Sequence, residues 1–150
     1  MVEFTKIRVA GATLYLVLFI VLIGCKEKQQ FLPVTFSSAG VFSVNSGSLL
    51  EKKPVFYVYN DNGTAIKFFI VRVNDKAYSY FDICNSCKGK NLGYRTHETG
   101  IECRACLITI PYDELETGIG GCYPYHLKGE ERDGKYIVSK EEILKLKEYL

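Results

Sequence analysis

The sequence of 150 residues has few of the features that mark the common enzyme and nucleic-acid-binding classes. It contains no tryptophan, one methionine and two histidines, and its formal net charge is +2. It has no glycine-rich phosphate loop and no Ser, His and Asp set with a recognisable local signature. A near-neutral chain without a clustered basic face is not expected to bind nucleic acid. The six cysteines therefore remain as the residues on which chemistry can depend.

The first 25 residues have the pattern of an export signal. Val9–Ile23 is an apolar run behind two basic residues, and it is short for a bilayer span, which needs about 20 residues. Residues 22–25 are similar to the lipobox that bacterial lipoprotein signal peptidase cleaves. We predict a signal peptide over residues 1–24 and a lipid on Cys25; an uncleaved N-terminal anchor helix is the alternative.

Either alternative predicts a protein at the cell membrane that faces the periplasm or the extracellular side. Residues 25–30 form the lipidated cysteine and a polar tether, and residues 31–150 have the length of a single domain. The basic residues before the apolar run include no adjacent Arg pair, so the chain should be exported unfolded. Any metal would then be acquired outside the cytoplasm.

Strand patterns dominate the domain as far as Asp82. Residues 55–59, 66–73 and 77–81 are rich in β-branched and aromatic side chains, and turn-forming residues separate them. This pattern predicts a three-stranded meander.

Two further hairpins are predicted outside the meander. The first has its turn at Ser37–Gly40, between residues 35–36 and 41–44. The second has its turn at Asp133-Gly134, between residues 127–132 and 135–138.

A helix is predicted after the last hairpin. Ser139 and Glu142 have the spacing of a capping box, and apolar residues recur behind them at Ile143, Leu146 and Leu150. The predicted fold class is all-β and mainly antiparallel, with metal-binding loops over residues 82–126 and a C-terminal helix.

Two CxxC pairs, separated by fifteen residues, are the strongest chemical signal in the chain. Cys84 and Cys87 form the first pair, and Cys103 and Cys106 form the second. Each CxxC places two sulfurs on one tight turn, so two turns side by side can supply four thiolates to an ion. Four thiolates suit zinc, an iron-sulfur cluster or a single iron, so ligand type alone does not identify the metal.

Two alternatives without a metal remain open for these cysteines. In an oxidising compartment they can be disulfide staples, and CxxC is also the unit of thiol-disulfide exchange. The exchange reaction is disfavoured, because thioredoxin-like proteins place CxxC near a βαβ pattern and both pairs here lie in a β-rich run.

Cys122 and His126 are additional candidates for the site. Cys122 ends a glycine-rich loop, Gly118–Gly121, that can close on the CxxC pairs. It is a metal ligand, a redox partner or a buried thiol. His126 can supply a nitrogen ligand, although a partly exposed loop histidine is the alternative.

The order of these motifs resembles the FtrD-like membrane iron-sulfur protein family. The resemblance extends from about Phe31 to Val138 and is carried by four segments: Phe81–Cys87, Gly93-Tyr94, Cys103–Cys106 and Gly118–Cys122. Members are described as iron-sulfur-containing membrane proteins, and the namesake belongs to a bacterial ferrous iron uptake system. The resemblance implies a ligand set of Cys84, Cys87, Cys103 and Cys106, with Cys122 as the cysteine of a GGC motif.

The chain departs from the family pattern in two places. The segment Lys88–Gly93 is longer than usual, and Tyr123–His126 replaces the usual Asn-Pro-Ile-Pro, so His126 inherits no role. Many members join this domain to several membrane helices, so a permease-like part would here be another protein.

The order of a sheet, two metal loops and a final hairpin is also similar to a Rieske domain. Cys87 and Cys106 then stand where Rieske loops have histidines. Thiolate in place of imidazole predicts a lower reduction potential for an iron-sulfur site.

We therefore predict a lipid-anchored protein that binds an iron-sulfur cluster or iron and serves electron transfer or ferrous iron handling, rather than an enzyme. Its expected partner is an envelope redox protein or iron permease. The alternatives are a zinc- or disulfide-stapled binding module without redox activity, and a thiol-disulfide exchange protein.

Overall fold

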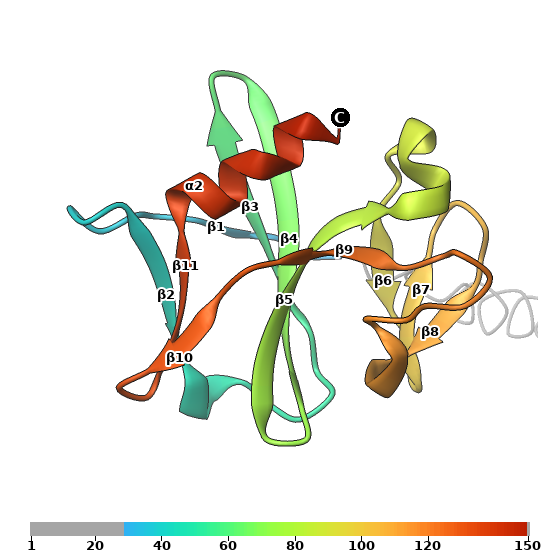
Figure 1. Ribbon diagram of the computed structural model, residues 1–150, viewed down its shortest axis with the longest axis horizontal. Coiled ribbons are helices and arrows are strands. Elements are labelled where there is room, and N and C mark those ends of the chain that lie inside the picture. Colours follow the sequence, from blue (N-terminus) through green and yellow to red (C-terminus); the bar gives the residue numbers. More distant parts are fainter. Residues whose placement is uncertain (1–28, 150) are drawn as a thin grey trace, which may run out of the picture.

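The computed structural model describes residues 29–149 and shows three β-sheets with a short C-terminal helix (Figure 1). The predicted signal peptide, Cys25 and most of the tether lie outside these residues. Between the named strands the pairing is antiparallel except where β1 meets β3, so the mainly antiparallel all-β prediction is confirmed. No helix within residues 29–149 is long and apolar enough to cross a membrane.

The central sheet contains the predicted meander. Its strand order is β1-β3-β4-β5-β9, with bounds Leu32–Pro33, Val55–Asp61, Thr64–Val73, Lys76–Cys84 and Pro124–Leu127. The first turn places Asn62 and Gly63 at positive φ, and the second does the same with Asn74 and Asp75. Asn, Asp and Gly tolerate this left-handed backbone, which is why the turns form where these residues occur.

The second sheet has the order β10-β11-β2, with bounds Glu130–Arg132, Lys135–Ser139 and Val41–Asn45. The predicted hairpin at Asp133-Gly134 is confirmed. The predicted hairpin at Ser37–Gly40 is wrong: the turn forms, but residues 35–36 are not a strand, and β2 pairs with β11. The distant strand offers β2 a ladder of five paired residues, which two local residues cannot match.

The C-terminal helix begins at its predicted cap. The Glu142 N–H donates to the Ser139 hydroxyl over 3.2 Å. Helix α2 spans Lys140–Leu144 and continues as the 3-10 turn η4, Lys145–Glu148. Ile143 and Leu146 are buried and join the core beside the central sheet, so the helix covers that face.

The third sheet was not predicted and lies at one end of the molecule (Figure 1). Its order is β6-β7-β8, with bounds Tyr94–Thr96, Gly100–Cys103 and Thr109–Pro111. Gly100 lets β7 approach β8 closely, because a Cβ there would overlap the backbone of Ile110. We name residues 84–122, which include this sheet, the cysteine lobe.

The central sheet is buried on both faces. Alternate residues of β4 point to opposite sides, as in any strand: Phe68 and Ile70 enter the core under the helix, and Phe69 and Val71 enter the core under the cysteine lobe. The second core also includes Cys84, Cys103 and Cys122 of the cysteine lobe. The cysteine lobe therefore packs against one face of the central sheet.

Candidate metal centre

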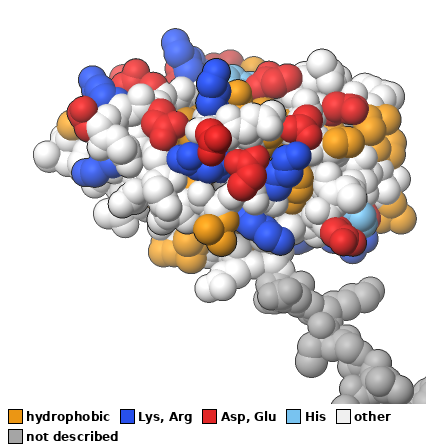
Figure 2. Space-filling model, turned by 90° about the horizontal axis from the view of Figure 1, so that it is seen from below, with side chains coloured by type: hydrophobic (Ala, Val, Ile, Leu, Met, Phe, Trp, Pro, Cys, Tyr) orange, Lys and Arg blue, Asp and Glu red, His pale blue; other side chains and the backbone are white. Residues whose placement is uncertain are grey.

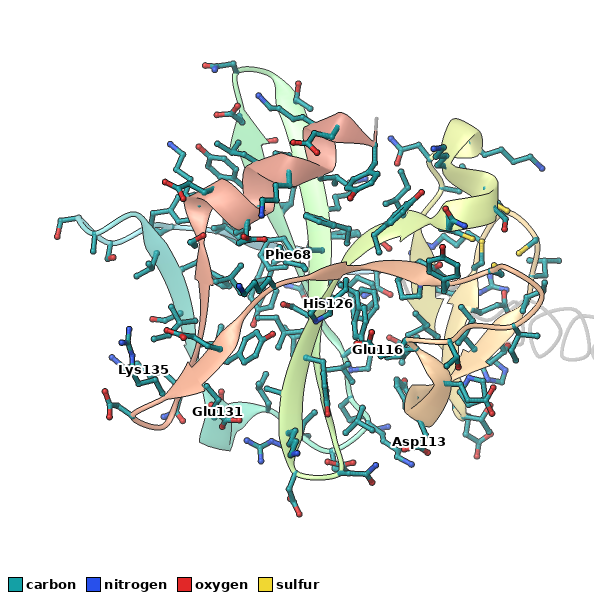
Figure 3. The ribbon with its side chains drawn as sticks, in the orientation of Figure 1. Phe68, Asp113, Glu116, His126, Glu131 and Lys135 are labelled. Carbon is teal, nitrogen blue, oxygen red and sulfur yellow. The ribbon has the colours of Figure 1, made fainter. Side chains whose placement is uncertain are left out.

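Five cysteines from three loops meet in the cysteine lobe, where Figure 3 shows their sulfur atoms close together. Two groups have all their sulfurs within 4.8 Å of one another, and Cys103 belongs to both: Cys84, Cys103 and Cys122, and Cys87, Cys103 and Cys106. The two CxxC pairs therefore do lie side by side, as their spacing predicts. Cys122, which is not in the predicted set of four ligands, lies among them.

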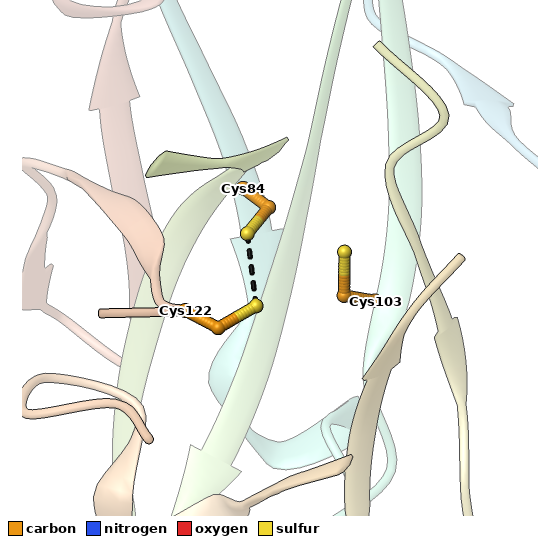
Figure 4. A group of neighbouring side chains, drawn as sticks. All are labelled: Cys84, Cys103 and Cys122. Atoms are coloured by element: carbon orange, nitrogen blue, oxygen red, sulfur yellow. Dashed lines mark hydrogen bonds between the residues drawn. The ribbon is translucent and has the colours of Figure 1, made fainter. Parts of the chain in front are cut away.

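Cys122 touches one cysteine of each CxxC pair. Its Sγ lies 2.9 Å from Sγ of Cys84 and 3.3 Å from Sγ of Cys106. Figure 4 shows the sulfurs of Cys84 and Cys122 pointing at each other, with Cys103 beside them. The described cysteines are all free thiols, and both of these contacts join cysteines of different motifs. The sulfurs of the three loops thus form one contiguous group.

The first loop follows directly from the meander. Strand β5 ends at Cys84, and the 3-10 turn η2, Asn85–Lys90, carries Cys87. Asn91 ends the turn in the left-handed region, at φ 45°. The Asn85 N–H donates to the Tyr123 carbonyl over 3.0 Å, which ties the first loop to the third.

A buried carboxylate joins the first and second loops. Asp82 Oδ1 accepts a hydrogen bond of 2.6 Å from the Tyr94 N–H. Gly93 has φ +69°, and a Cβ there would lie 2.7 Å from Asp82 Oδ1 and closer to Oδ2. The Gly93 carbonyl in turn accepts from the Arg104 N–H over 3.0 Å. We name Asp82, Gly93 and Tyr94 the Asp82 lock. These residues connect the segment before the first CxxC turn to the second CxxC turn, and so set the position of one turn relative to the other.

Burial makes this carboxylate hard to ionise. It raises the pKa of Asp82 to about 7, although the Tyr94 N–H and the charges of Arg104 and Lys67 oppose the shift.

The second loop is a tight turn after β7. The Cys103 N–H donates to the Ile108 carbonyl over 2.9 Å, and the Cys103 carbonyl accepts from the Leu107 N–H over 2.8 Å. Leu107 has φ 62°, which is rare for a leucine. The turn places Cys103 in the core and Cys106 at the surface.

The third loop is held closed. Strand β9 pairs with β5 so that Pro124 lies opposite Cys84, which brings Cys122 next to that cysteine. Ser86 Oγ donates to the Gly121 carbonyl over 2.6 Å. Gly118 has φ +67°, and a Cβ there would lie 2.5 Å from the Cys122 carbonyl oxygen. The glycines of this loop are therefore needed to place Cys122.

The five thiols fall into two groups, because the pKa is lowered in two of them and raised in three. Burial opposes ionisation of Cys84, but the Cys122 thiol, the nearby Tyr94 hydroxyl and two backbone N–H groups outweigh it and lower the pKa of Cys84. Burial also opposes ionisation of Cys106, where the Ile108 N–H and neighbouring thiols lower the pKa. Cys84 and Cys106 are thus the two clustered cysteines whose thiols lose a proton more readily than an ordinary cysteine.

Burial raises the pKa of Cys87 to about 12, and hydrogen bonds and charge repulsion from neighbouring cysteines contribute. The same causes raise the pKa of Cys122. Burial likewise raises the pKa of Cys103. A cation would replace the protons on these three sulfurs.

The Tyr94 hydroxyl supplies a direct test of whether the site fits a metal. It is buried and has no well-formed hydrogen bond within residues 29–149. Burial, and next the Cys84 sulfur beside it, raise the pKa of Tyr94. A metal-bound sulfur stays an acceptor permanently, so a thiolate centre would satisfy this orphaned donor.

His126 lies on β9 and Figure 3 shows it over the central sheet, away from the sulfur atoms. Its ring packs edge-on against Tyr80, and its Nε2 lies 4.0 Å from Glu116 Oε1. The groups of potential metal ligands found within residues 29–149 do not include it. Cys25, the predicted lipidation site, lies outside the described residues.

Comparison with known proteins gives one match. The family described as "membrane iron-sulfur containing protein FtrD-like" matches residues 49–150, which include all five clustered cysteines. No curated protein and no solved structure matches the chain significantly.

Proposed function

The chain belongs to the FtrD-like family of membrane iron-sulfur containing proteins, and from this membership we propose that it carries an iron-sulfur or iron centre for electron transfer or ferrous iron handling at the cell envelope. The observation that carries the proposal is the convergence of the cysteine sulfurs of three loops to contact distance. A bound iron centre would supply one-electron chemistry.

The chain's own residues would hold and tune this centre. Cys84, Cys87, Cys103 and Cys106 are the proposed ligands, with Cys122 beside them. Backbone N–H groups of residues 86, 87 and 108 lower the pKa values of Cys84 and Cys106, and donors placed this way favour the more negative, reduced state of a bound centre. Thiolates also suit zinc, which is the alternative metal, and a zinc-stapled binding module is the alternative function.

The surface around the exposed sulfur suits a protein partner. Cys106 is exposed and Cys87 is half-buried, so electrons or ions would pass through this edge. Each loop adds one exposed apolar side chain, at Leu92, Leu107 and Ile119. Figure 2 shows hydrophobic side chains gathered at this end of the molecule.

The same loops carry unneutralised positive charge. Lys88, Lys90 and Arg104 form no ion pair within residues 29–149. An envelope redox protein or iron permease with an acidic face around an apolar centre would complement them.

The membrane attachment through Cys25 remains part of the proposal. Phe31 packs edge-on against Phe56 at 5.7 Å and belongs to the core under the cysteine lobe. The described chain therefore starts beside this lobe. A short tether to a lipid on Cys25 would keep the metal centre close to the membrane surface, on the periplasmic or extracellular side.

Absorption spectroscopy of anaerobically purified protein, with iron, sulfide and zinc analysis, tests the function. We expect a visible absorption that dithionite bleaches. A colourless protein that holds zinc would contradict the redox function. A colourless, metal-free protein without free thiols would instead support disulfide staples.

A further inference from the structure

We propose that the five clustered cysteines form two metal positions that share the Cys103 thiolate. The inner position is bounded by Cys84, Cys103 and Cys122, and the outer position by Cys87, Cys103 and Cys106. The inference rests on the proposed function only in that the cluster binds metal. It adds that the centre is binuclear and that Cys122 is a ligand.

The inner position is a closed group of three sulfurs. Cys84, Cys103 and Cys122 are 2%, 1% and 1% exposed. Zinc-sulfur bonds of about 2.3 Å place tetrahedral sulfurs about 3.8 Å apart. The Sγ atoms of Cys84 and Cys122 lie 2.9 Å apart, and all three sulfurs lie within 4.8 Å of one another. Cys84 and Cys122 would therefore separate by about 1 Å on binding, and the three sulfurs could then form one face of a tetrahedron whose fourth corner takes a non-protein ligand such as sulfide.

The outer position faces solvent. Its sulfurs also lie within 4.8 Å of one another, but Cys106 is exposed and Cys87 is half-buried. Cys106 Sγ lies 3.3 Å from Cys122 Sγ, so the two positions are adjacent as well as joined through Cys103. The outer metal would be the one that a partner or an incoming ion reaches.

The number of sulfurs favours two ions over one. A single tetrahedral ion uses four sulfurs and would leave a fifth, buried thiol in contact with its ligands. Two ions that share one thiolate use all five. Charge leads to the same conclusion, because four thiolates around one divalent ion leave two uncompensated negative charges beside the fifth thiol, whereas five thiolates around two divalent ions leave one. Lys88, Lys90 and Arg104 are available on the same loops to balance the remainder.

The third loop is built to hold Cys122 in the inner position. The hydrogen bond from Ser86 to Gly121 and the close packing of Gly118 on the Cys122 carbonyl orient that residue towards Cys84. A spare buried thiol would need neither of these constraints.

Titration of the reduced, metal-free full-length protein with Co²⁺ under anaerobic conditions tests the proposal. Thiolate-to-cobalt absorption reports the number of ions bound, and electron paramagnetic resonance reports whether they share a ligand. We expect two equivalents in the wild type, with spin coupling as the second ion binds. Cys122→Ser and Cys87→Ser should each retain one equivalent, and Cys103→Ser should lose both.

Cys25→Ser is the matched cysteine control and should keep two equivalents. Saturation of the wild type at one equivalent would refute the binuclear centre and leave the metal-binding function intact, whereas absence of binding would refute both. Two uncoupled ions in the wild type would refute the shared thiolate, even if Cys103→Ser fails to fold.

Discussion

Substitution of Gly93 by alanine tests the Asp82 lock that joins the two CxxC loops. Gly93 combines a φ of +69° with direct contact to the Asp82 carboxylate, which is 5% exposed and accepts the Tyr94 N–H. A methyl group at this position has no room unless Asp82 moves and its hydrogen bond breaks. Gly134 is a matched control, because it has φ +71° and open space around its Cα.

The two substitutions share one cost and differ in another. The positive φ costs an alanine about 1 kcal/mol at either position. At Gly93 the displaced carboxylate adds about 2 kcal/mol, from overpacking and from the lost hydrogen bond to a buried group. We therefore expect the free energy of unfolding to fall by about 3 kcal/mol in Gly93→Ala and by about 1 kcal/mol in Gly134→Ala.

Thermal and urea unfolding of the reduced, metal-free protein, followed by circular dichroism, measures the difference. A gap of about 2 kcal/mol corresponds to a melting temperature about 8 °C lower for Gly93→Ala than for Gly134→Ala. Gly93→Ala should also bind Co²⁺ more weakly, because the lock sets the distance between the CxxC turns, while Gly134→Ala should bind it normally. Equal unfolding costs, or normal metal affinity in Gly93→Ala, would refute the role of the lock.

Three further predictions concern the sulfurs and the anchor. Tyr94→Phe should change metal-free stability by less than about 1 kcal/mol, because its hydroxyl has no well-formed partner. In an iron-loaded protein it should lower the reduction potential, measured by spectroelectrochemistry, because the substitution removes the hydroxyl that would donate to the iron-bound Cys84 sulfur beside it. Metal affinity should rise with pH, because the raised pKa values of Cys87 and Cys122 keep both protonated at neutral pH and each proton must leave; pH-independent affinity in Co²⁺ titrations would contradict this. Cys25→Ser should release the protein from membranes or leave it uncleaved in cell fractionation, and unchanged processing would reject the lipobox.

Local signals account for the parts of the fold that could be predicted. The turns at Asn62-Gly63 and Asp133-Gly134 form because their residues tolerate positive φ, and the helix begins at Ser139 because its hydroxyl caps a free N–H. The third sheet gave no such signal, since its strands are only three or four residues long. The partner of β2 was mispredicted because a turn does not determine which strand offers the longer ladder.

Residue spacing alone shows which cysteines share a turn, because a separation of three residues places Cys84 near Cys87 and Cys103 near Cys106 whatever surrounds them. The contacts of Cys122 with Cys84, across 38 residues of chain, and with Cys106, across 16, are visible only in the folded protein. That contact depends on the pairing of β9 with β5 and on a loop held closed by Ser86 and its glycines. Long-range contacts of this kind arise from the packing of whole elements, which the spacing of residues along the chain does not reveal.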